Sequence, residues 1–394
     1  MKASEKQNIQ LFRNDLEAVF VRRPNRFLII AKAGRREIRC HCPNPGRMTE
    51  MLFPGARLIL EKRKIAVKPA AAKTSYTAAG IYYHDGVAPL ISARANLAAE
   101  ALILKKIIPG LREIHSEFTL GNSRFDFLCI DKQGRRHLVE VKACSLIEYG
   151  VAMFPDAPSA RALKHLEELA LLRETGYCCH VLFVIVHSKP KVFIPNLHTD
   201  PELAAALNRY AKTVEIHAAL IRCDKDGNAA LVKSSVPVDL SCGELAAKNA
   251  GSYLVVLEIA EAAEIAAGSL GTIAFKAGWY VYAGSALKNL TQRLNRHLRK
   301  VRKAKHWHLD YLTPFAKNID ALPIRSCRNL ECCLAAALKA LGGRGIPRFG
   351  CTDCRNSGGK CESHLYYFKT NPMKDRAFVE MLLEFRHQTG SLFL

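Results

Sequence analysis

The sequence predicts a multidomain α/β protein, because its length and its changes of hydrophobic period both divide the chain. The 394 residues exceed what one ordinary core accommodates, so two or three domains are expected. Short apolar runs separated by turns fill residues 1–90, and helices alternate with strands over 91–242. A new pattern with Gly and Tyr in its strands occupies 248–370, before a final helix and tail over 371–394.

The charge of the chain favours polyanionic partners. Fifty-eight Lys and Arg against 36 Asp and Glu give a formal net charge of +22, which promotes salt-sensitive association with DNA or RNA. No apolar run reaches membrane-spanning length, and residues 1–10 lack the apolar core of a secretory signal. We therefore expect a cytoplasmic protein without a membrane partner, whose 14 cysteines are reduced. The oligomeric state is not indicated.

The first block contains four short apolar runs, at 26–32, 36–42, 56–62 and 80–83, which predict a small β-rich module or barrel. Its Cys40-His41-Cys42 segment lacks a second ligand pair nearby, so it is interpreted as a strand followed by a Pro-rich turn.

The second block predicts the order αβββαβ. Its expected elements are a helix at 93–106, strands at 114–120, 123–130 and 137–143, a helix at 158–173 and a strand at 179–187. This order indicates an α/β domain built on a mixed sheet.

Three polar residues interrupt two of these otherwise apolar strands. Asp126 lies on one strand, and Glu140 and Lys142 lie on the same face of the next. Hairpin pairing would bring Asp126 near Glu140. Two carboxylates can hold Mg²⁺ or Mn²⁺, and an adjacent lysine can orient water and offset phosphate charge. Glu100, on the preceding helix, is either a further metal ligand or a solvent-facing charge.

Four separated motifs resemble the sugar fermentation stimulation protein family: H-C-P-N-P-G-R-M, S-R-F-D-F-L, H-L-V-E-V-K and F-P-D-A-P-S-A-R-A-L-K-H-L. The resemblance covers about the first 240 residues. It implies an OB-like N-terminal barrel and a PD-(D/E)XK nuclease-like domain that binds DNA and cleaves it with a divalent metal. By this resemblance Asp126 and Glu140 are metal ligands and Lys142 is the catalytic lysine.

Basic residues in these motifs are the predicted DNA contacts of the N-terminal half. Arg161 and His165 are spaced i and i+4 on one helix, where they could grip a phosphate or form a hydrated face. Arg47 and Arg124 are expected to contact nucleic acid as well.

The third block suggests a second phosphodiesterase-like site. Tyr253 and Tyr282 lie on two strands ahead of a helix at 287–301, which carries Arg293 and His297 at i and i+4. A tyrosine could serve as base, Arg293 as the phosphate-binding cation, and Glu331 as ligand to Mg²⁺ or Mn²⁺. The surrounding Arg296, Arg299 and Lys300 are expected to bind nucleic acid. Packing of the tyrosines on a small sheet is the alternative.

This block, with its K-H-W-H-L-D-Y-L and S-H-L-Y-Y-F segments, resembles the GIY-YIG endonuclease superfamily over residues 251–368. The resemblance implies a GIY-YIG-like α/β domain and gives Tyr253, Tyr282, Arg293 and His297 catalytic roles. Two departures weaken the match. Ser252 and Ala283 replace the isoleucines of the motif, and no late asparagine is evident.

Two late clusters contain metal-ligating residue types. His306, His308 and Asp310 share a face in a strand, whereas in a helix only His306 and Asp310 do. They could bind a metal or form hydrogen bonds beside Trp307. The cysteines and histidine of a C-x2-C-x6-C-x2-H pattern suit tetrahedral zinc, with reduced thiols near a turn as the alternative: Cys351, Cys354, Cys361 and His364.

The predicted function is metal-dependent cleavage of DNA, or of RNA, with endonuclease and exonuclease modes both open. The alternative is a non-catalytic DNA-binding regulator of sugar-metabolism genes that retains nuclease folds. No helix-turn-helix pattern supports the regulator.

Overall fold

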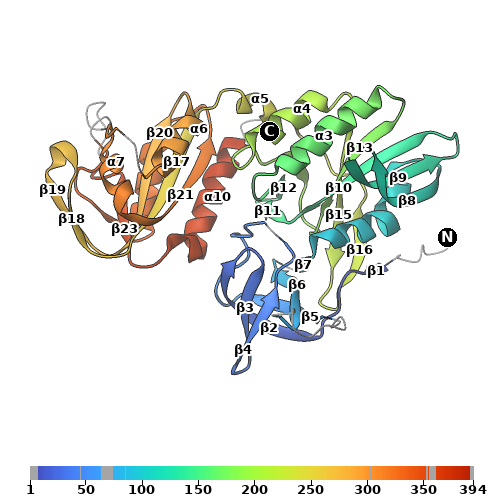
Figure 1. Ribbon diagram of the computed structural model, residues 1–394, viewed down its shortest axis with the longest axis horizontal. Coiled ribbons are helices and arrows are strands. Elements are labelled where there is room, and N and C mark those ends of the chain that lie inside the picture. Colours follow the sequence, from blue (N-terminus) through green and yellow to red (C-terminus); the bar gives the residue numbers. More distant parts are fainter. Residues whose placement is uncertain are drawn as a thin grey trace. The chain divides into compact units, whose positions relative to one another are not determined.

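The computed structural model describes residues 8–44, 46–63, 74–84, 86–121, 123–300, 304–351, 354 and 361–390. It contains two compact units, Met1–Gly243 and Glu244–Leu394. The elements of each are labelled in Figure 1. Within the described residues, every helix is too short or too polar to cross a lipid bilayer.

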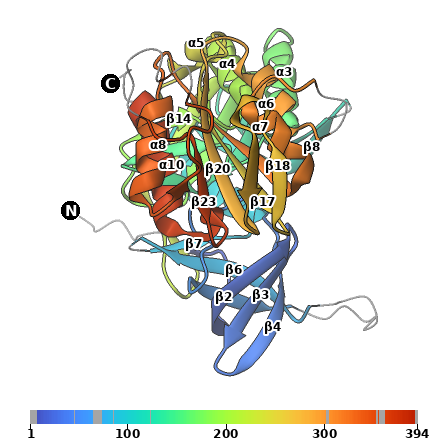
Figure 2. The same cartoon turned by 90° about the vertical axis from the view of Figure 1, so that its left-hand side faces the viewer.

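Unit 1 begins with a closed five-stranded barrel, which confirms the predicted OB-like module (Figure 2). Its strands are β2 (Leu16–Asn25), β3 (Leu28–Ala33), β4 (Arg36–His41), β5 (Arg57–Lys62) and β6 (Tyr76–Tyr83). Neighbours pair antiparallel, and a parallel pairing of Cys40 and His41 with Tyr76 and Thr77 closes the barrel. The short strand β7 (Gly86–Pro89) extends beside β6. The four predicted runs overlap β3 to β6, whereas β2 was not predicted.

A seven-stranded mixed sheet forms the rest of unit 1, as predicted. Its order is β1 (Asn8–Gln10), β16 (Asn228–Lys233), β15 (Glu215–Cys223), β13 (Cys178–Ile185), β10 (Arg136–Cys144), β9 (Ser123–Asp131) and β8 (Leu111–Leu120). The central strands β10, β13 and β15 are parallel and the outer pairings are antiparallel. The apolar run of β13 is buried because it lies mid-sheet. A smaller sheet contains β11 (Leu146–Glu148), β12 (Val151–Phe154) and β14 (Val192–Pro195).

Two capped helices accompany the sheet. Helix α3 (Ala160–Arg173) begins after Ser159, whose hydroxyl accepts a hydrogen bond from the Ala162 amide. Helix α4 (Pro201–Tyr210) begins after Asp200, whose carboxylate accepts a hydrogen bond from the Leu203 amide. The predicted first helix is a broken segment: η2 (Ser92–Arg94), α1 (Ala95–Ala98), a π-helical turn η3 (Ala99–Ile103) and α2 (Leu104–Ile107).

Unit 2 is a GIY-YIG-like α/β domain, as predicted. Its five-stranded sheet has the order β21 (Ala316–Arg325), β17 (Gly251–Ile259), β20 (Gly278–Ala286), β23 (Leu365–Phe368) and β22 (Arg344–Gly345). The accompanying elements are a hairpin of β18 (Ala263–Ala266) and β19 (Thr272–Phe275), with helices α6 (Leu290–Leu298), α7 (His308–Leu312), α8 (Glu331–Ala340) and α10 (Arg376–Gly390). Helix α5 (Cys242–Ala246) includes the last residues of unit 1 and the first residues of unit 2.

Three sequence predictions in unit 2 can be compared with the structure, and they have different outcomes. The helix expected at 287–301 is α6, and Val301 lies outside the described residues, as do residues 391–394 of the expected C-terminal tail. The histidine segment starting at His306 enters α7, so the strand alternative is wrong.

Candidate functional site

Asp126, Glu140 and Lys142 meet on neighbouring strands of unit 1. Strands β9 and β10 pair with Phe127 opposite Val139, which places Asp126 across from Glu140. Asp126 accepts hydrogen bonds from the Val141 amide at 2.7 Å and from Asn96 Nδ2 at 2.7 Å. Hairpin register therefore brings the two carboxylates together.

Glu140 is nearly inaccessible to solvent and has two polar neighbours, a lysine and a histidine. Its side chain is 3% exposed, its Oε1 accepts from His165 Nδ1 at 2.6 Å, and the same oxygen contacts the Lys142 ammonium. Its other oxygen, Oε2, is buried without a hydrogen-bond partner among the described residues. A buried, unpartnered carboxylate oxygen lacks the stabilisation that burial normally demands.

The two carboxyl groups differ in charge preference. Burial and the adjacent Glu140 carboxylate raise the pKa of Asp126. Burial also pushes the pKa of Glu140 upward, but the hydrogen bond from His165 and the charge of Lys142 outweigh it and hold this pKa below its ordinary value. A divalent cation between the two would favour the ionised form of both. Two carboxylates, one with an unpartnered oxygen, fit Mg²⁺ or Mn²⁺.

The first helix presents Asn96 to this centre, whereas Glu100 is exposed. In a regular α-helix residues 96 and 100 would share a face. A π-helical turn begins at Ala99 and contains Glu100. Sequence reasoning missed Asn96 because no motif marks a neutral amide that reaches Asp126 from a separate segment.

A basic hollow of about 430 Å³, the α3 hollow, lies beside this centre. Its lining residues are Ser123, Arg124, Ala160, Arg161, Lys164 and His165. Arg124 and Arg161 are exposed, while His165 is 7% exposed and bonds to Glu140. The alternative of a hydrated His165 is therefore wrong, because its ring points into the carboxylate centre. Arg47 is exposed in the loop after β4 and is not among the lining residues.

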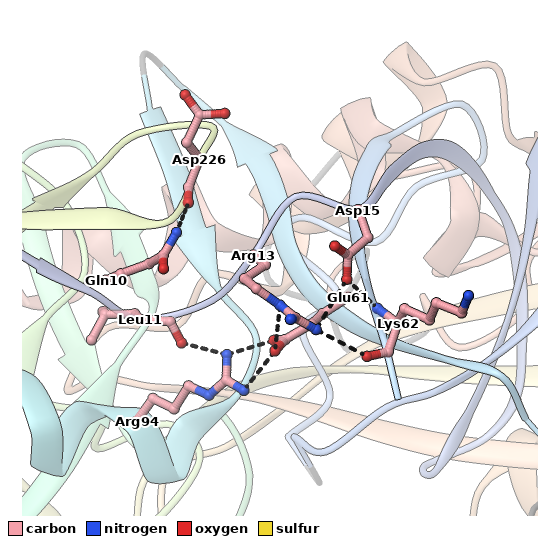
Figure 3. Close-up of polar contacts among 8 residues, drawn as sticks. All are labelled: Gln10, Leu11, Arg13, Asp15, Glu61, Lys62, Arg94 and Asp226. Atoms are coloured by element: carbon pink, nitrogen blue, oxygen red, sulfur yellow. Dashed lines mark hydrogen bonds and ion pairs between the residues drawn. The ribbon is translucent and has the colours of Figure 1, made fainter. Parts of the chain in front are cut away.

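A second hollow, of about 530 Å³, was not predicted from the sequence and lies where the barrel meets the nuclease-like part of unit 1. It is lined by Arg13, Glu61, Lys62, Arg63, Thr77, Ile91 and Arg94. Figure 3 shows Arg94 donating to both oxygens of Glu61, at 2.6 and 3.2 Å, and to the Leu11 carbonyl. The barrel is thus tied to the segment that carries Asn96.

The predicted residues of unit 2 also converge. The Tyr253 hydroxyl lies 2.9 Å from His297 Nε2, and the Tyr282 ring centroid lies 6.3 Å from that of His297. Burial raises the pKa of Tyr253, and the nearby Arg293 guanidinium opposes this effect. Glu331 accepts from Ser285 Oγ at 2.6 Å and pairs with His364 Nδ1 at 2.8 Å.

The basic residues in and just after α6 differ in whether their side chains contact the protein or face solvent. Arg296 donates to Asp310 at 2.6 Å and stacks on Trp307, and Lys300 donates to the carbonyls of Ala316 and Lys317. Arg299 is exposed. Arg296 and Lys300 are therefore engaged by the fold, and Arg299 faces solvent.

The Asp310 carboxylate binds backbone amides and is not part of a group of histidine metal ligands. It accepts from the amides of His306 and Trp307 at 2.9 and 3.0 Å, while His308 lies beside Ser269 and Phe349. Within the described ranges, His306, His308 and Asp310 do not form a ligand group. The hydrogen-bonding alternative holds for Asp310.

The late cysteine cluster differs from the predicted one by one residue. Cys354, Cys361 and His364 are joined by Cys332, and one ligand atom from each lies within 4.8 Å of all the others. Cys351, the predicted fourth member, is buried with its Sγ 3.6 Å from the Glu362 carbonyl oxygen. Because Cys332 lies at the start of α8, far from the motif in sequence, spacing alone could not identify it.

A ladder of three histidines crosses the unit 1 sheet and was also missed. His137 Nδ1 lies 3.0 Å from His180 Nε2, and His180 Nδ1 lies 3.1 Å from His217 Nε2. The residues come from β10, β13 and β15, so only the strand order reveals their proximity. Asp131 lies 3.3 Å from the outer nitrogen of His137.

Comparison with known proteins assigns both units. Residues 21–90 match the SfsA N-terminal OB domain, 93–227 the sugar fermentation stimulation protein RE domain, and 252–387 a domain of unknown function, DUF123.

Curated relatives match the first part of the chain. A sugar fermentation stimulation protein homolog of Pyrobaculum neutrophilum is 36% identical over 213 residues, which is 54% of this chain and 89% of that protein. The Clostridium botulinum homolog is 35% identical, over 56% of this chain and 95% of that protein. The solved structure of Pyrococcus furiosus SfsA, in complex with Ca²⁺, is 28% identical with a TM-score of 0.52, and the match covers 59% of this chain and 99% of that one. The chain belongs to the sugar fermentation stimulation protein family.

Proposed function

We propose that this protein binds DNA and hydrolyses its phosphodiester bonds with Mg²⁺ or Mn²⁺ held by Asp126 and Glu140. The observation that carries the proposal is the buried, unpartnered Oε2 of Glu140, next to Asp126 and Lys142. We assign residues 1–90 as the DNA-binding barrel, 91–242 as the nuclease-like domain, 248–370 as the GIY-YIG-like domain and 371–394 as the C-terminal helix and tail. None of the 14 cysteines forms a disulfide, which supports a place in the reducing cytoplasm.

Each residue of the centre has a distinct task. The bound cation supplies Lewis-acid stabilisation of the phosphate and lowers the pKa of water. Asn96 and the Val141 amide orient Asp126, and His165 orients Glu140. Lys142 would position the attacking water and stabilise charge on the phosphate. The Ca²⁺ in the Pyrococcus furiosus relative supports an oxygen-ligated divalent site.

DNA affinity is expected to come from distributed phosphate contacts. The net charge of +22, the barrel and the cations of the α3 hollow all favour a polyanion. Arg124 and Arg161 line that hollow and face solvent, which places cations where a phosphate would approach Glu140.

The test is cleavage of plasmid, single-stranded DNA and RNA in Mg²⁺, Mn²⁺ or chelator. Asp126→Asn and Lys142→Ala are each expected to abolish cleavage and to retain DNA affinity within a few fold. Glu100→Gln is the matched control, because Glu100 is an exposed carboxylate on the neighbouring helix, and it should cleave normally. Activity that survives both changes but disappears with Tyr253→Phe would assign cleavage to unit 2. A preference for RNA would change the substrate class.

One observation favours the alternative, a DNA-binding regulator of sugar-metabolism genes without catalysis. Lys142 pairs with the charge of Glu140, and His165 hydrogen-bonds to the same oxygen, without a metal. Tight DNA binding with no strand scission under any metal would support this second function and reject the first.

A further inference from the structure

Three thiols and one imidazole of unit 2 converge from two segments distant in sequence. Cys332 is the second residue of α8, and Cys354, Cys361 and His364 precede β23. Their ligand atoms all lie within 4.8 Å of one another, and the Sγ atoms of Cys332 and Cys354 are 3.3 Å apart. None of the fourteen cysteines forms a disulfide.

The spacing fits a tetrahedral metal. With zinc–sulfur bonds of about 2.3 Å, two sulfur ligands are roughly 3.8 Å apart. The 3.3 Å between two of the thiols and the 4.8 Å limit for the whole set bracket that value. Side-chain rotations that change these separations by up to about 1 Å would bring all four atoms onto one ion.

His364 provides an independent indication. It is 1% exposed, and its Nε2 is buried without a hydrogen-bond partner in the described part of the chain. Its Nδ1 lies 2.8 Å from Glu331 Oε1, although neither ring nitrogen has a hydrogen bond among the described residues. A carboxylate this close favours a proton on Nδ1, which leaves the Nε2 lone pair for a metal, as in many zinc sites.

We propose that Cys332, Cys354, Cys361 and His364 bind a structural zinc ion. Three thiolates and an imidazole are a ligand set that zinc prefers over Mg²⁺ or Mn²⁺. Four protein ligands leave no open position, so the ion holds the fold together and performs no chemistry. The site joins the start of α8 to the segment before β23 and thereby fixes Glu331, which immediately precedes Cys332. It is independent of the Asp126 centre.

The wild-type full chain allows a direct test. Protein purified without chelator should contain about one zinc per chain, and Co²⁺ should replace it with the absorption of tetrahedral thiolate coordination. Alkylation followed by mass spectrometry should show Cys332, Cys354 and Cys361 protected until a strong chelator is added. Cys327 and Cys333 are exposed and outside the cluster, so they should react in both states. Trp279 and Trp307 both lie in unit 2, so their fluorescence should report its earlier thermal unfolding after chelation.

Matched variants identify the ligands. Cys332→Ser and Cys361→Ser should lose the zinc, whereas Cys333→Ser, one residue along α8, should keep it. Cys351→Ser should also keep it, although the sequence spacing alone would make Cys351 a ligand. The proposal is overturned if wild-type protein from zinc-supplemented cells binds neither zinc nor Co²⁺. It is equally overturned if zinc is lost with Cys351→Ser and kept with Cys332→Ser, or if only His217→Ala of the histidine ladder removes it.

Discussion

Removing the cations of the α3 hollow should make DNA binding measurably less sensitive to salt. The change is the triple substitution Arg124→Gln, Arg161→Gln and Lys164→Gln. These side chains line the hollow beside the Glu140 centre. All three face solvent, so the substitution should alter DNA binding without disturbing the core.

The expected size follows from the number of cations and from their present partners. Each phosphate neutralised contributes about 0.9 to the slope of log affinity against log salt. Arg124 pairs with Glu117 at 3.5 Å and Lys164 with Glu168 at 3.6 Å, and these exposed pairs compete with DNA. The slope should therefore fall by between about 0.9, if only Arg161 contacts phosphate, and about 2.7. The upper value corresponds to a roughly 40-fold difference in how much affinity is lost between about 50 and 200 mM salt.

Fluorescence anisotropy of a labelled duplex across a salt series measures this slope, with chelator present to prevent cleavage. The control is Lys105→Gln, Lys106→Gln and Arg112→Gln, which removes three exposed cations of unit 1 outside the hollow. A slope that changes by less than about 0.5, or by as much in the control, would show that phosphates do not enter the α3 hollow.

Two further predictions concern unit 1. Burial lowers the pKa of His180 from 6.5 to about 3, so between these values the unfolded chain binds a proton that the folded chain does not. The contribution of His180 to the free energy of unfolding should be fully present above about pH 6.5. Below that pH it should fall by roughly 1.4 kcal/mol per pH unit. Hydrogen exchange of β13, corrected for intrinsic rates, should show this slope in wild type and in His115→Ala. The slope should be shallower in His180→Gln, where His217, whose pKa is also lowered by burial, still contributes. An equal slope in His180→Gln would refute the assignment. Arg94→Met should destabilise unit 1 by about 2 kcal/mol, because it leaves the largely buried Glu61 without its bidentate partner. Arg57→Met breaks an exposed pair with Glu17 and should cost about 1 kcal/mol or less in urea unfolding followed by the same exchange probe. Equal losses would contradict the ranking.

The carboxylate centre could be predicted from sequence because its geometry is local. Asp126 and Glu140 lie on adjacent strands joined by a tight turn, and a side-chain period of two fixes which face each occupies. Hydrophobic patterning of the same local kind also identified the barrel strands β3 to β6, which contain apolar runs. It missed β2, whose exposed residues include Glu17 and Arg22 and mask the buried Ala18 and Phe20.

Other site residues depend on long-range packing that local patterns do not encode. The histidine ladder exists only because β10, β13 and β15 are neighbours in the sheet. These strands are not consecutive in the chain, so the sequence does not show that they pair. Asn96 reaches Asp126 from α1, which is 30 residues away in the chain. Cys332 replaces Cys351 because the start of α8 packs against the segment before β23.

The two candidate centres differ in how many oxygens of their key glutamate already have a partner in the fold. In unit 2, Glu331 Oε2 accepts from Ser285 and Oε1 pairs with His364, so each oxygen has a partner before any metal arrives. A catalytic metal at Glu331 would have to displace one of these contacts, and the zinc site would hold His364 in place. In unit 1, Glu140 keeps one buried oxygen without a partner, so a metal adds an interaction there without breaking one. Since an added interaction requires no compensating loss, metal binding is favoured more at Glu140 than at Glu331.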